Sequence, residues 1–384
     1  MKSAGISTKA TATNAIGHLN VALAEKPAHF GKIYTQITLI YHLCRVDAPD
    51  ILLAMLGQGM ISSVVKTLLW LEKHSPSTRK DEKAACECLT SCFFLLIQPT
   101  MTRNGPSWVS KALDAGILLA IMKSAPRMQH MPDIAVSNCA ALLSYNLCQY
   151  LVYKSVIRSA ARAIKRVDHD PTLADSGGHI WEAWNVFKTL AEERIAFKDG
   201  KDELDTEEAE RHSCNRAQCD ARTNYHQLLR CSGCFEAFYC DKSCQRMDWP
   251  DHKPSCKKIQ RYLRESAGTS IPTGAGESKL LFDIMSTEIH ANKEPRGKLI
   301  AALSAAPAGC SPSEFAFSLD YTKVPVEISV FPVGEHPDPD EYWEQTIERA
   351  LQSNGRLMAA RALVQRGDGI KETLFTTPVP QKRD

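Results

Sequence analysis

Half of the cysteines in this chain are crowded into one short segment. The 384 residues contain 14 cysteines, and seven of them lie with one histidine between positions 214 and 256: Cys214, Cys219, Cys231, Cys234, Cys240, Cys244, His252 and Cys256. A disulfide framework suits a short secreted domain, whereas this chain is long and its N-terminal residues contain no continuous apolar secretory segment. The crowding therefore predicts a metal site.

The eight side chains divide into four pairs of metal ligands. The pairs are Cys214-x4-Cys219, Cys231-x2-Cys234, Cys240-x3-Cys244 and His252-x3-Cys256. Each pair can direct two ligands at one ion, so the set fills two closed tetrahedral Zn²⁺ sites, and thiolates favour zinc over Mg²⁺ or Ca²⁺. Free cysteines buried in a core are the alternative. We expect two structural zinc ions per chain, because a catalytic zinc keeps a position open for water.

Residues 238–256 carry a more specific pattern, a Tyr-Cys, then a Cys-Gln, then Trp-x2-His-Lys-x2-Cys. The segment 214–256 resembles the MYND zinc finger. The resemblance implies that the two sites interleave. The first ion would take Cys214, Cys219, Cys240 and Cys244, and the second would take Cys231, Cys234, His252 and Cys256. One departure is the x4 spacing of the first pair, where x2 is commoner.

The resemblance also implies a function, because MYND fingers are protein-interaction modules that bind short proline-containing peptides. It assigns Ser243, Gln245 and Trp249 to the peptide groove. An indole can stack on proline rings while an amide bonds the extended peptide backbone. The alternatives are that Trp249 packs in the small core of the finger and that Gln245 is an ordinary solvated helix position.

The rest of the sequence predicts a multidomain protein with a mainly α-helical N-terminal half. Apolar residues at spacings of three and four indicate helices over residues 30–197. Leu56–Ile61 and Leu113–Leu118 both place glycine at a helix end before a new apolar helix. This echo resembles the turn of armadillo-like repeats, and the alternative is an ordinary helical bundle with glycine caps.

The remaining segments complete the expected organisation. Residues 1–29 are expected to be a flexible tail, 198–212 an acidic linker, 213–258 the finger and 259–276 a basic helix with a linker. Residues 277–384 are expected to form a small α+β domain. In that domain we expect strands over 315–321 and 324–333, a helix over 340–353, and a hairpin around Gly367-Asp368-Gly369.

Three other classes of function are less well supported. A lysine methyltransferase is the main rival, because one enzyme family embeds a MYND finger in a SET domain, but Arg211-His212-Ser213-Cys214 lacks the Asn of that family's signature and precedes the finger. The net charge of +2 gives no general attraction to nucleic acid, so a nucleic-acid-binding transcriptional regulator is a second alternative. No uninterrupted apolar run approaches the roughly 20 residues of a membrane span. We expect a non-enzymatic, zinc-binding adaptor inside the cell, in the nucleus or the cytoplasm.

Overall fold

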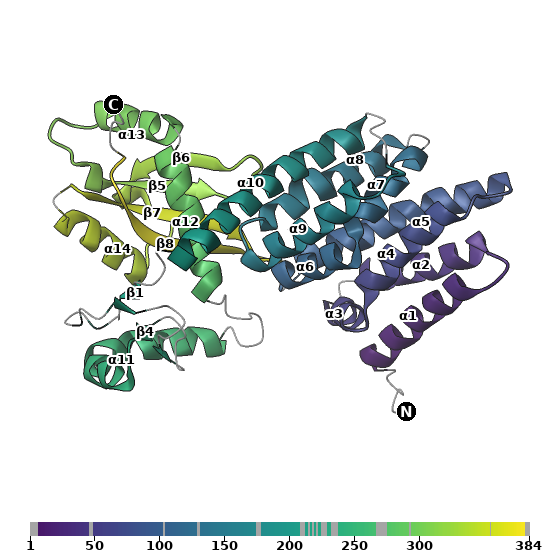
Figure 1. Ribbon diagram of the computed structural model, residues 1–384, viewed down its shortest axis with the longest axis horizontal. Helices are drawn as coiled ribbons and strands as arrows, with labels where there is room; N and C mark the ends of the chain where they lie inside the picture. The colour runs from purple at the N-terminus through teal and green to yellow at the C-terminus, as the bar shows by residue number, and fades with distance from the viewer. Residues whose placement is uncertain are drawn as a thin grey trace.

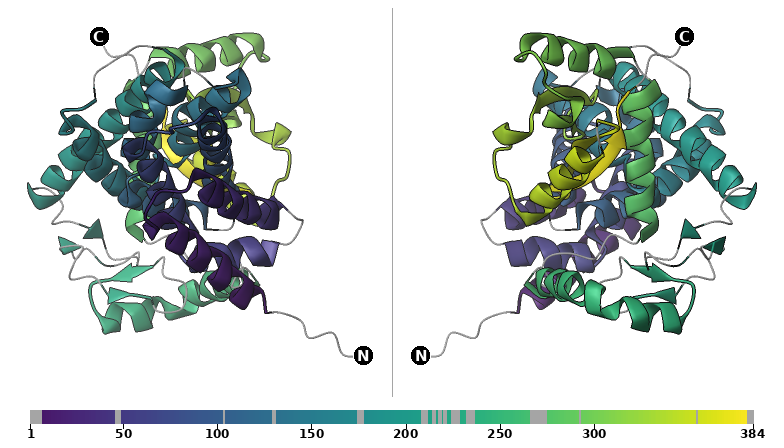
Figure 2. Two further views of the ribbon diagram at one scale, coloured as in Figure 1. Left: turned by 90° about the vertical axis from the view of Figure 1, so that its right-hand side faces the viewer. Right: turned by 90° about the vertical axis from the view of Figure 1, so that its left-hand side faces the viewer.

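A computed structural model gives the fold of most of the chain (Figure 1). It describes residues 7–45, 49–102, 104–128, 131–173, 178–207, 212–213, 216, 219, 222–223, 229–231, 237–265, 275–291, 293–353 and 355–380. Helices of the first half build one end of the molecule and a small sheet with its own helices builds the other, and the cysteine-rich segment lies to one side of this body (Figures 1 and 2).

The first half is helical, as predicted. Its elements are α1 (Thr8–Ala24), α2 (Phe30–Arg45), α3 (Pro49–Gly57), α4 (Met60–Lys73), α5 (Arg79–Ile97), η1 (Gln98–Met101), α6 (Gly105–Ala115), α7 (Ile117–Met128), α8 (Asp133–Ala141), η2 (Leu142–Leu147), η3 (Cys148–Tyr150), α9 (Lys154–Asp168) and α10 (His179–Glu207). The segment η2 is a single π-helical stretch, and the 3-10 turn η3 follows it directly.

The N-terminal tail that the sequence predicts is largely a helix. Within α1, Ala12 and Leu19 are completely buried, and the helix packs against α2, α3 and α4. The expectation was wrong because most of the buried side chains of α1 are alanines, which give little hydrophobic contrast along the sequence.

The two glycine turns lie where the sequence places them. Gly59 precedes α4 with φ 85° and Gly116 precedes α7 with φ 97°, a backbone conformation that glycine adopts without a steric penalty. These turns do not by themselves make a repeat, and an armadillo-like solenoid is not confirmed by the structure.

A third glycine is required for packing. A Cβ atom at Gly105, the first residue of α6, would collide with the hydroxyl group of Tyr150. That hydroxyl is buried and donates a hydrogen bond to the Thr100 carbonyl oxygen. The close approach joins the start of α6 to the segment that follows the π-helix.

One long helical stretch, Arg79–Met101, is long and apolar enough to cross a membrane by length and composition. Its uninterrupted apolar runs are short, as expected, but its average hydropathy is high. Half of the apolar window is buried inside the protein, where α5 packs against α2 and α4. A helix in the core of a globular protein has the same properties, so this stretch is weak support for a membrane span.

The C-terminal region is α+β, as predicted. It contains α12 (Ala275–Ala291), α13 (Lys293–Ala305), η5 (Pro312–Glu314), β5 (Phe315–Asp320), β6 (Glu327–Pro332), η6 (Val333–Glu335), α14 (Glu341–Gln352), β7 (Leu357–Gln365) and β8 (Ile370–Pro378). The four strands form one sheet in the order β6-β5-β7-β8, with β5 and β7 parallel and the other pairs antiparallel. The predicted hairpin is β7–β8, and Asp340 caps α14 by accepting a hydrogen bond from the backbone N–H of Trp343 at 2.8 Å.

The two faces of the sheet are covered differently. Alternate residues of β5 and β7 point to opposite faces, so Ala316 and Ala359 pack with Trp343 of α14. Phe317 and Ala360 point the other way, into a hydrophobic core that also contains the helices of the N-terminal half.

The sheet therefore shares its core with the helical half instead of forming the separate small domain that the sequence suggested. The side-chain amide of Gln149 donates to the Thr322 carbonyl oxygen at 2.6 Å, and the Tyr153 hydroxyl donates to the Gln365 carbonyl oxygen at 2.8 Å. The proposed acidic linker also differs, because α10 continues to Glu207. The body thus comprises both ends of the chain, and the finger is an insertion between α10 and α12.

Candidate metal centre

Two short hairpins and one long helix form the inserted segment. The strands β1 (His212–Ser213) and β2 (Arg222–Thr223) pair antiparallel, as do β3 (Leu229–Arg230) and β4 (Phe238–Tyr239). The helix α11 (Lys242–Glu265) follows β4 after a two-residue turn and includes the basic stretch predicted to start at residue 259. The paired strands and the helix bring ligand pairs that are far apart in the sequence to common points.

Six of the eight predicted ligands gather in two groups. Cys219, Cys240 and Cys244 form one group, and a second contains Cys231, His252 and Cys256; within each group all ligand atoms lie within 4.8 Å of one another. Cys214 and Cys234, the fourth ligand predicted for each site, lie outside the described residues. The division between the groups is the interleaved one that the family resemblance implies.

The distances between sulfur atoms fit a metal ion. Cys240 Sγ lies 3.7 Å from Cys219 Sγ and 3.4 Å from Cys244 Sγ, and Cys231 Sγ lies 3.7 Å from Cys256 Sγ. A disulfide requires about 2.05 Å between the sulfurs, whereas tetrahedral zinc with Zn–S bonds of about 2.3 Å holds two thiolates roughly 3.8 Å apart. The donor set and its spacing therefore fit zinc.

A single helix supplies ligands to both groups. Cys244 lies in the first turn of α11, while His252 and Cys256 lie four residues apart further along it. The start of the helix is fixed by Asp241, whose carboxylate accepts a hydrogen bond from the backbone N–H of Cys244 at 2.7 Å. This cap positions a ligand of the first group directly.

Other contacts around the ligands were not predicted. Tyr239 is completely buried, and its hydroxyl donates to the Asp248 carboxylate at 2.7 Å, which joins β4 to α11. An Arg216 guanidinium nitrogen lies 3.9 Å from Cys244 Sγ, which places a positive charge beside a thiolate. The Asp at the position before a helix was a visible capping signal, whereas the Tyr239 and Arg216 contacts depend on the folded loops.

The described part of the finger has a small buried cluster. Its buried members among the described residues are Cys231, Ala237, Tyr239, Cys244 and Cys256. Three of these five are ligands, so little apolar area other than the metal site itself stabilises the fold. Small metal-ligated modules of this kind draw much of their folding free energy from the bound metal.

The predicted peptide-binding residues lie on α11. Ser243 is exposed, Gln245 is half-buried, and Trp249 is 38% exposed, one helical turn after Gln245. Trp249 is not part of the finger's buried cluster, and one edge of its ring meets the His252 ring at a centroid distance of 6.0 Å. The indole is therefore a surface residue beside the second metal group, and the core role considered for it is not supported.

Among the described residues, the cysteines outside the finger form no further metal-binding group. Burial raises the pKa of Cys44 and of Cys148 to about 12 and that of Cys139 still further. These thiols stay protonated near neutral pH, so they are core residues and not thiolate nucleophiles.

The arrangement defines a cysteine-rich, zinc-binding finger inserted into a helical body. Residues 212–256 match the family model of the MYND finger, so the chain carries a MYND finger in this segment.

Comparison with curated proteins gives similarity over short segments. The chain is 40% identical over 57 residues to F-box protein At1g67340 of Arabidopsis thaliana, covering 14% of this chain and 15% of that protein. It is 36% identical over 78 residues to histone-lysine N-methyltransferase SMYD3 of Homo sapiens (17% of this chain, 18% of that protein), and 39% identical over 54 residues to Egl nine homolog 1 of Homo sapiens (14% and 13%). The chain thus spans less than a fifth of each of these relatives, and no solved structure matches it.

Proposed function

We propose that the protein is a non-enzymatic adaptor whose MYND finger binds short proline-containing segments of partner proteins. The observation that carries the proposal is the exposed indole of Trp249 on α11, the helix that also carries Ser243 and Gln245, beside the second metal group. Protein interaction is the usual role of this finger, and the geometry suits it because a rigid helix presents the aromatic ring to solvent.

Two structural zinc ions would hold this surface in place. The first would be bound by Cys219, Cys240 and Cys244 with Cys214, and the second by Cys231, His252 and Cys256 with Cys234. Four protein ligands on each ion leave no position for a reacting water, so the metal would stabilise the fold and perform no chemistry. Zinc binding contributes about 10–16 kcal/mol per structural site, which is large beside the contribution of Ala237 and Tyr239, the two non-ligand members of the buried cluster among the described residues.

Recognition of proline would rest on stacking and one directional contact. A proline-rich segment is extended before it binds and loses little conformational entropy, and its rings can lie flat on an indole. The half-buried amide of Gln245 lies close enough to Trp249 on the helix to hydrogen-bond a backbone that lies across both. A patch of this size predicts micromolar or weaker affinity unless other parts of the protein add contacts.

The rival functions have less support. The curated methyltransferases match only over the segment that contains the finger, so the similarity supports a shared finger and gives no support for a methyltransferase domain. The basic residues of 211–264 exceed the acidic ones by only six, and seven thiolates with two Zn²⁺ ions reduce that excess to about +3. A direct nucleic-acid role therefore ranks below peptide binding. Reduced zinc-binding thiolates are typical of an intracellular protein, in the nucleus or the cytoplasm.

The first experiment is the zinc content of the purified protein, measured by elemental analysis beside a Cys240→Ser variant. We expect two ions per chain in the wild type and a loss in the variant, together with loss of finger structure. A value of zero or one ion in the wild type would contradict the double site and remove the main support for the proposal.

The second experiment measures the binding of proline-containing peptides by fluorescence or calorimetry. Trp249→Ala should weaken binding at least about tenfold, while both zinc ions are retained. Met247→Ala is the matched control, because Met247 is 50% exposed on the same helix and should have no effect. Peptide binding that survives Trp249→Ala would contradict the assigned surface. A rise in thermal stability on adding a methyl-donor nucleotide would favour the methyltransferase alternative.

A further inference from the structure

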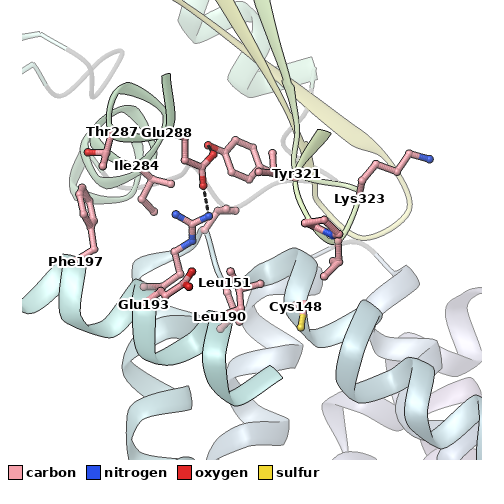
Figure 3. Close-up of a pocket in the computed structure, with 15 residues that line it drawn as sticks. Cys148, Leu151, Leu190, Glu193, Phe197, Ile284, Thr287, Glu288, Tyr321 and Lys323 are labelled. Atoms are coloured by element: carbon pink, nitrogen blue, oxygen red, sulfur yellow. Dashed lines mark hydrogen bonds and ion pairs between the residues drawn. The ribbon is translucent and has the colours of Figure 1, made fainter. Parts of the chain in front are cut away.

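A cavity of about 370 Å³ lies between the helical half of the body and the sheet. Its walls come from α10, α12, the segment after η3, and the turn that follows β5 (Figure 3). The lining is mostly apolar and includes Leu151, Leu190, Phe197, Ile284 and Val326. Its size is at the lower end of the range of roughly 300–1,000 Å³ typical of small-molecule sites.

The cavity lies between the two helices that flank the finger in the sequence. The helix α10 leads into the finger and α12 leads out of it, and both contribute to the cavity wall. The two helices are joined there by an ion pair between Arg194 of α10 and Glu288 of α12 (Figure 3). A molecule bound in this cavity would contact both of these helices at once.

The polar groups of the cavity form one short network. Glu288 accepts from Arg194 through one carboxylate oxygen and from the Tyr321 hydroxyl, at 2.7 Å, through the other. Burial, with the charge of Glu288 adding to it, raises the pKa of Tyr321 well above its ordinary value, so the hydroxyl remains a donor. Both carboxylate oxygens of Glu288 are thus engaged.

Arg194 has unused hydrogen-bonding capacity. A guanidinium group has five N–H donors, and within the described residues Arg194 donates only to Glu288. Its side chain is 13% exposed and lines the cavity. A ligand with an acceptor oxygen would meet these remaining donors.

The charges around the cavity cancel. Arg194 and Glu288 neutralise each other, and the lining also contains one acid, Glu193, and one base, Lys323, whose amine points away from the ion pair (Figure 3). A charged ligand would lose its hydration without gaining a counter-ion, so an uncharged ligand is favoured. Cys148 also lines the cavity, but its thiol is protonated and donates to the Leu143 carbonyl oxygen at 3.3 Å, so it is not placed as a nucleophile.

We propose that this cavity binds an uncharged, largely apolar small molecule with one hydrogen-bond acceptor, such as an amide carbonyl, that accepts from Arg194. The apolar walls would contact the apolar part of the molecule, and the Arg194 guanidinium group would donate a hydrogen bond to its acceptor oxygen. This site is separate from the peptide surface of the finger, and its test does not depend on the finger's function.

The test uses three probes that share one apolar body: 4-phenylbutanamide, 4-phenylbutanoate and 4-phenylbutylamine. With about 12 non-hydrogen atoms, the amide should bind with a dissociation constant on the order of a millimolar. Ligand-observed NMR titrations of the full-length protein measure all three. The amide should bind most tightly. The absence of saturable amide binding, or tighter binding of the carboxylate or the amine, would overturn the inference.

Two variants locate the binding. Val326→Trp places a large ring in the cavity and should abolish amide binding, whereas Ile370→Trp, at a position 59% exposed on β8, should leave it unchanged. The double variant Arg194→Met with Glu288→Gln removes both charges together and keeps an acceptor for Tyr321. It should fold and bind the amide about tenfold more weakly. Circular dichroism checks the fold of each variant. Full binding by the Val326→Trp protein or by the folded double variant would contradict the assigned site.

Discussion

The cap at the start of α11 allows a quantitative prediction about zinc binding. The Asp241 carboxylate accepts a hydrogen bond from the backbone N–H of Cys244, and the side chain of Cys244 belongs to the first metal group. Replacing a capping Asp by Ala costs about 0.5–2 kcal/mol of helix stability. Small zinc modules fold and bind metal in one coupled process, so in this finger the cost should appear as weaker metal affinity. Asp241→Ala should therefore bind zinc about 2- to 30-fold more weakly than the wild type.

Competition with a chromophoric chelator at fixed pH measures this difference. Asp241→Asn keeps the acceptor oxygen and should bind zinc nearly as well as the wild type. Lys242→Ala changes the next, exposed residue, which makes no capping hydrogen bond, and should have no effect. Wild-type zinc affinity in Asp241→Ala would refute the reasoning. An Asn variant as weak as the Ala variant would show that the charge matters and the cap does not.

The body supports two further predictions. Gly105→Ala should lower the free energy of unfolding by about 1–3 kcal/mol, because the new methyl group would collide with Tyr150. Gly17→Ala, in the middle of α1 with no atom within 4 Å of the new methyl group, should raise the free energy of unfolding by about 0.5–1 kcal/mol. Urea unfolding of the zinc-loaded proteins measures both changes, and equal changes would contradict the collision. Hydrogen bonds from Thr172, together with that from Lys123, lower the pKa of Asp170 from 3.8 to about 2. The stabilisation from Asp170 is therefore present above pH 4 and lost as the pH falls towards 2, so Asp170→Asn should be less stable than the wild type at pH 7 and the difference should narrow below pH 4. Unfolding curves recorded from pH 7 to pH 2 measure the difference in free energy of unfolding between the two proteins. A difference that stays constant over this range would contradict the lowered pKa of Asp170.

The parts of the structure that depend on nearby residues could be predicted from the sequence. The ligand pairs of the finger are separated by only two to four residues, so their grouping follows from local spacing and from the family pattern. The helix expected at 340–353 is α14, with Asp340 and Ser353 as its caps, and the hairpin expected around Gly367 is β7–β8. In each case a capping or turn residue adjoins the element that it ends.

The parts that depend on distant residues could not be predicted. Helix α1 buries mainly small alanines, so its sequence lacks the pattern of large apolar residues that indicates a packed helix and resembles a flexible tail. The shared core of the body depends on contacts such as the hydrogen bond from Gln149 to Thr322, which are 173 residues apart. No local pattern indicates such a pairing. The cavity between α10, α12 and the turn after β5, which arises where these distant segments meet, was missed for the same reason.

The insertion of the finger between α10 and α12 gives it two points of attachment instead of one. A module on a single linker can swivel freely, whereas here α10 and α12, the helices that flank the insertion, are held to each other within the body by the Arg194–Glu288 pair. The body forms its core from residues on both sides of the insertion, and none of the six described ligands of the finger belongs to that core. Zinc depletion should therefore disable the finger and leave the scaffold folded, which makes metal supply a way to switch the finger's function off without destroying the protein.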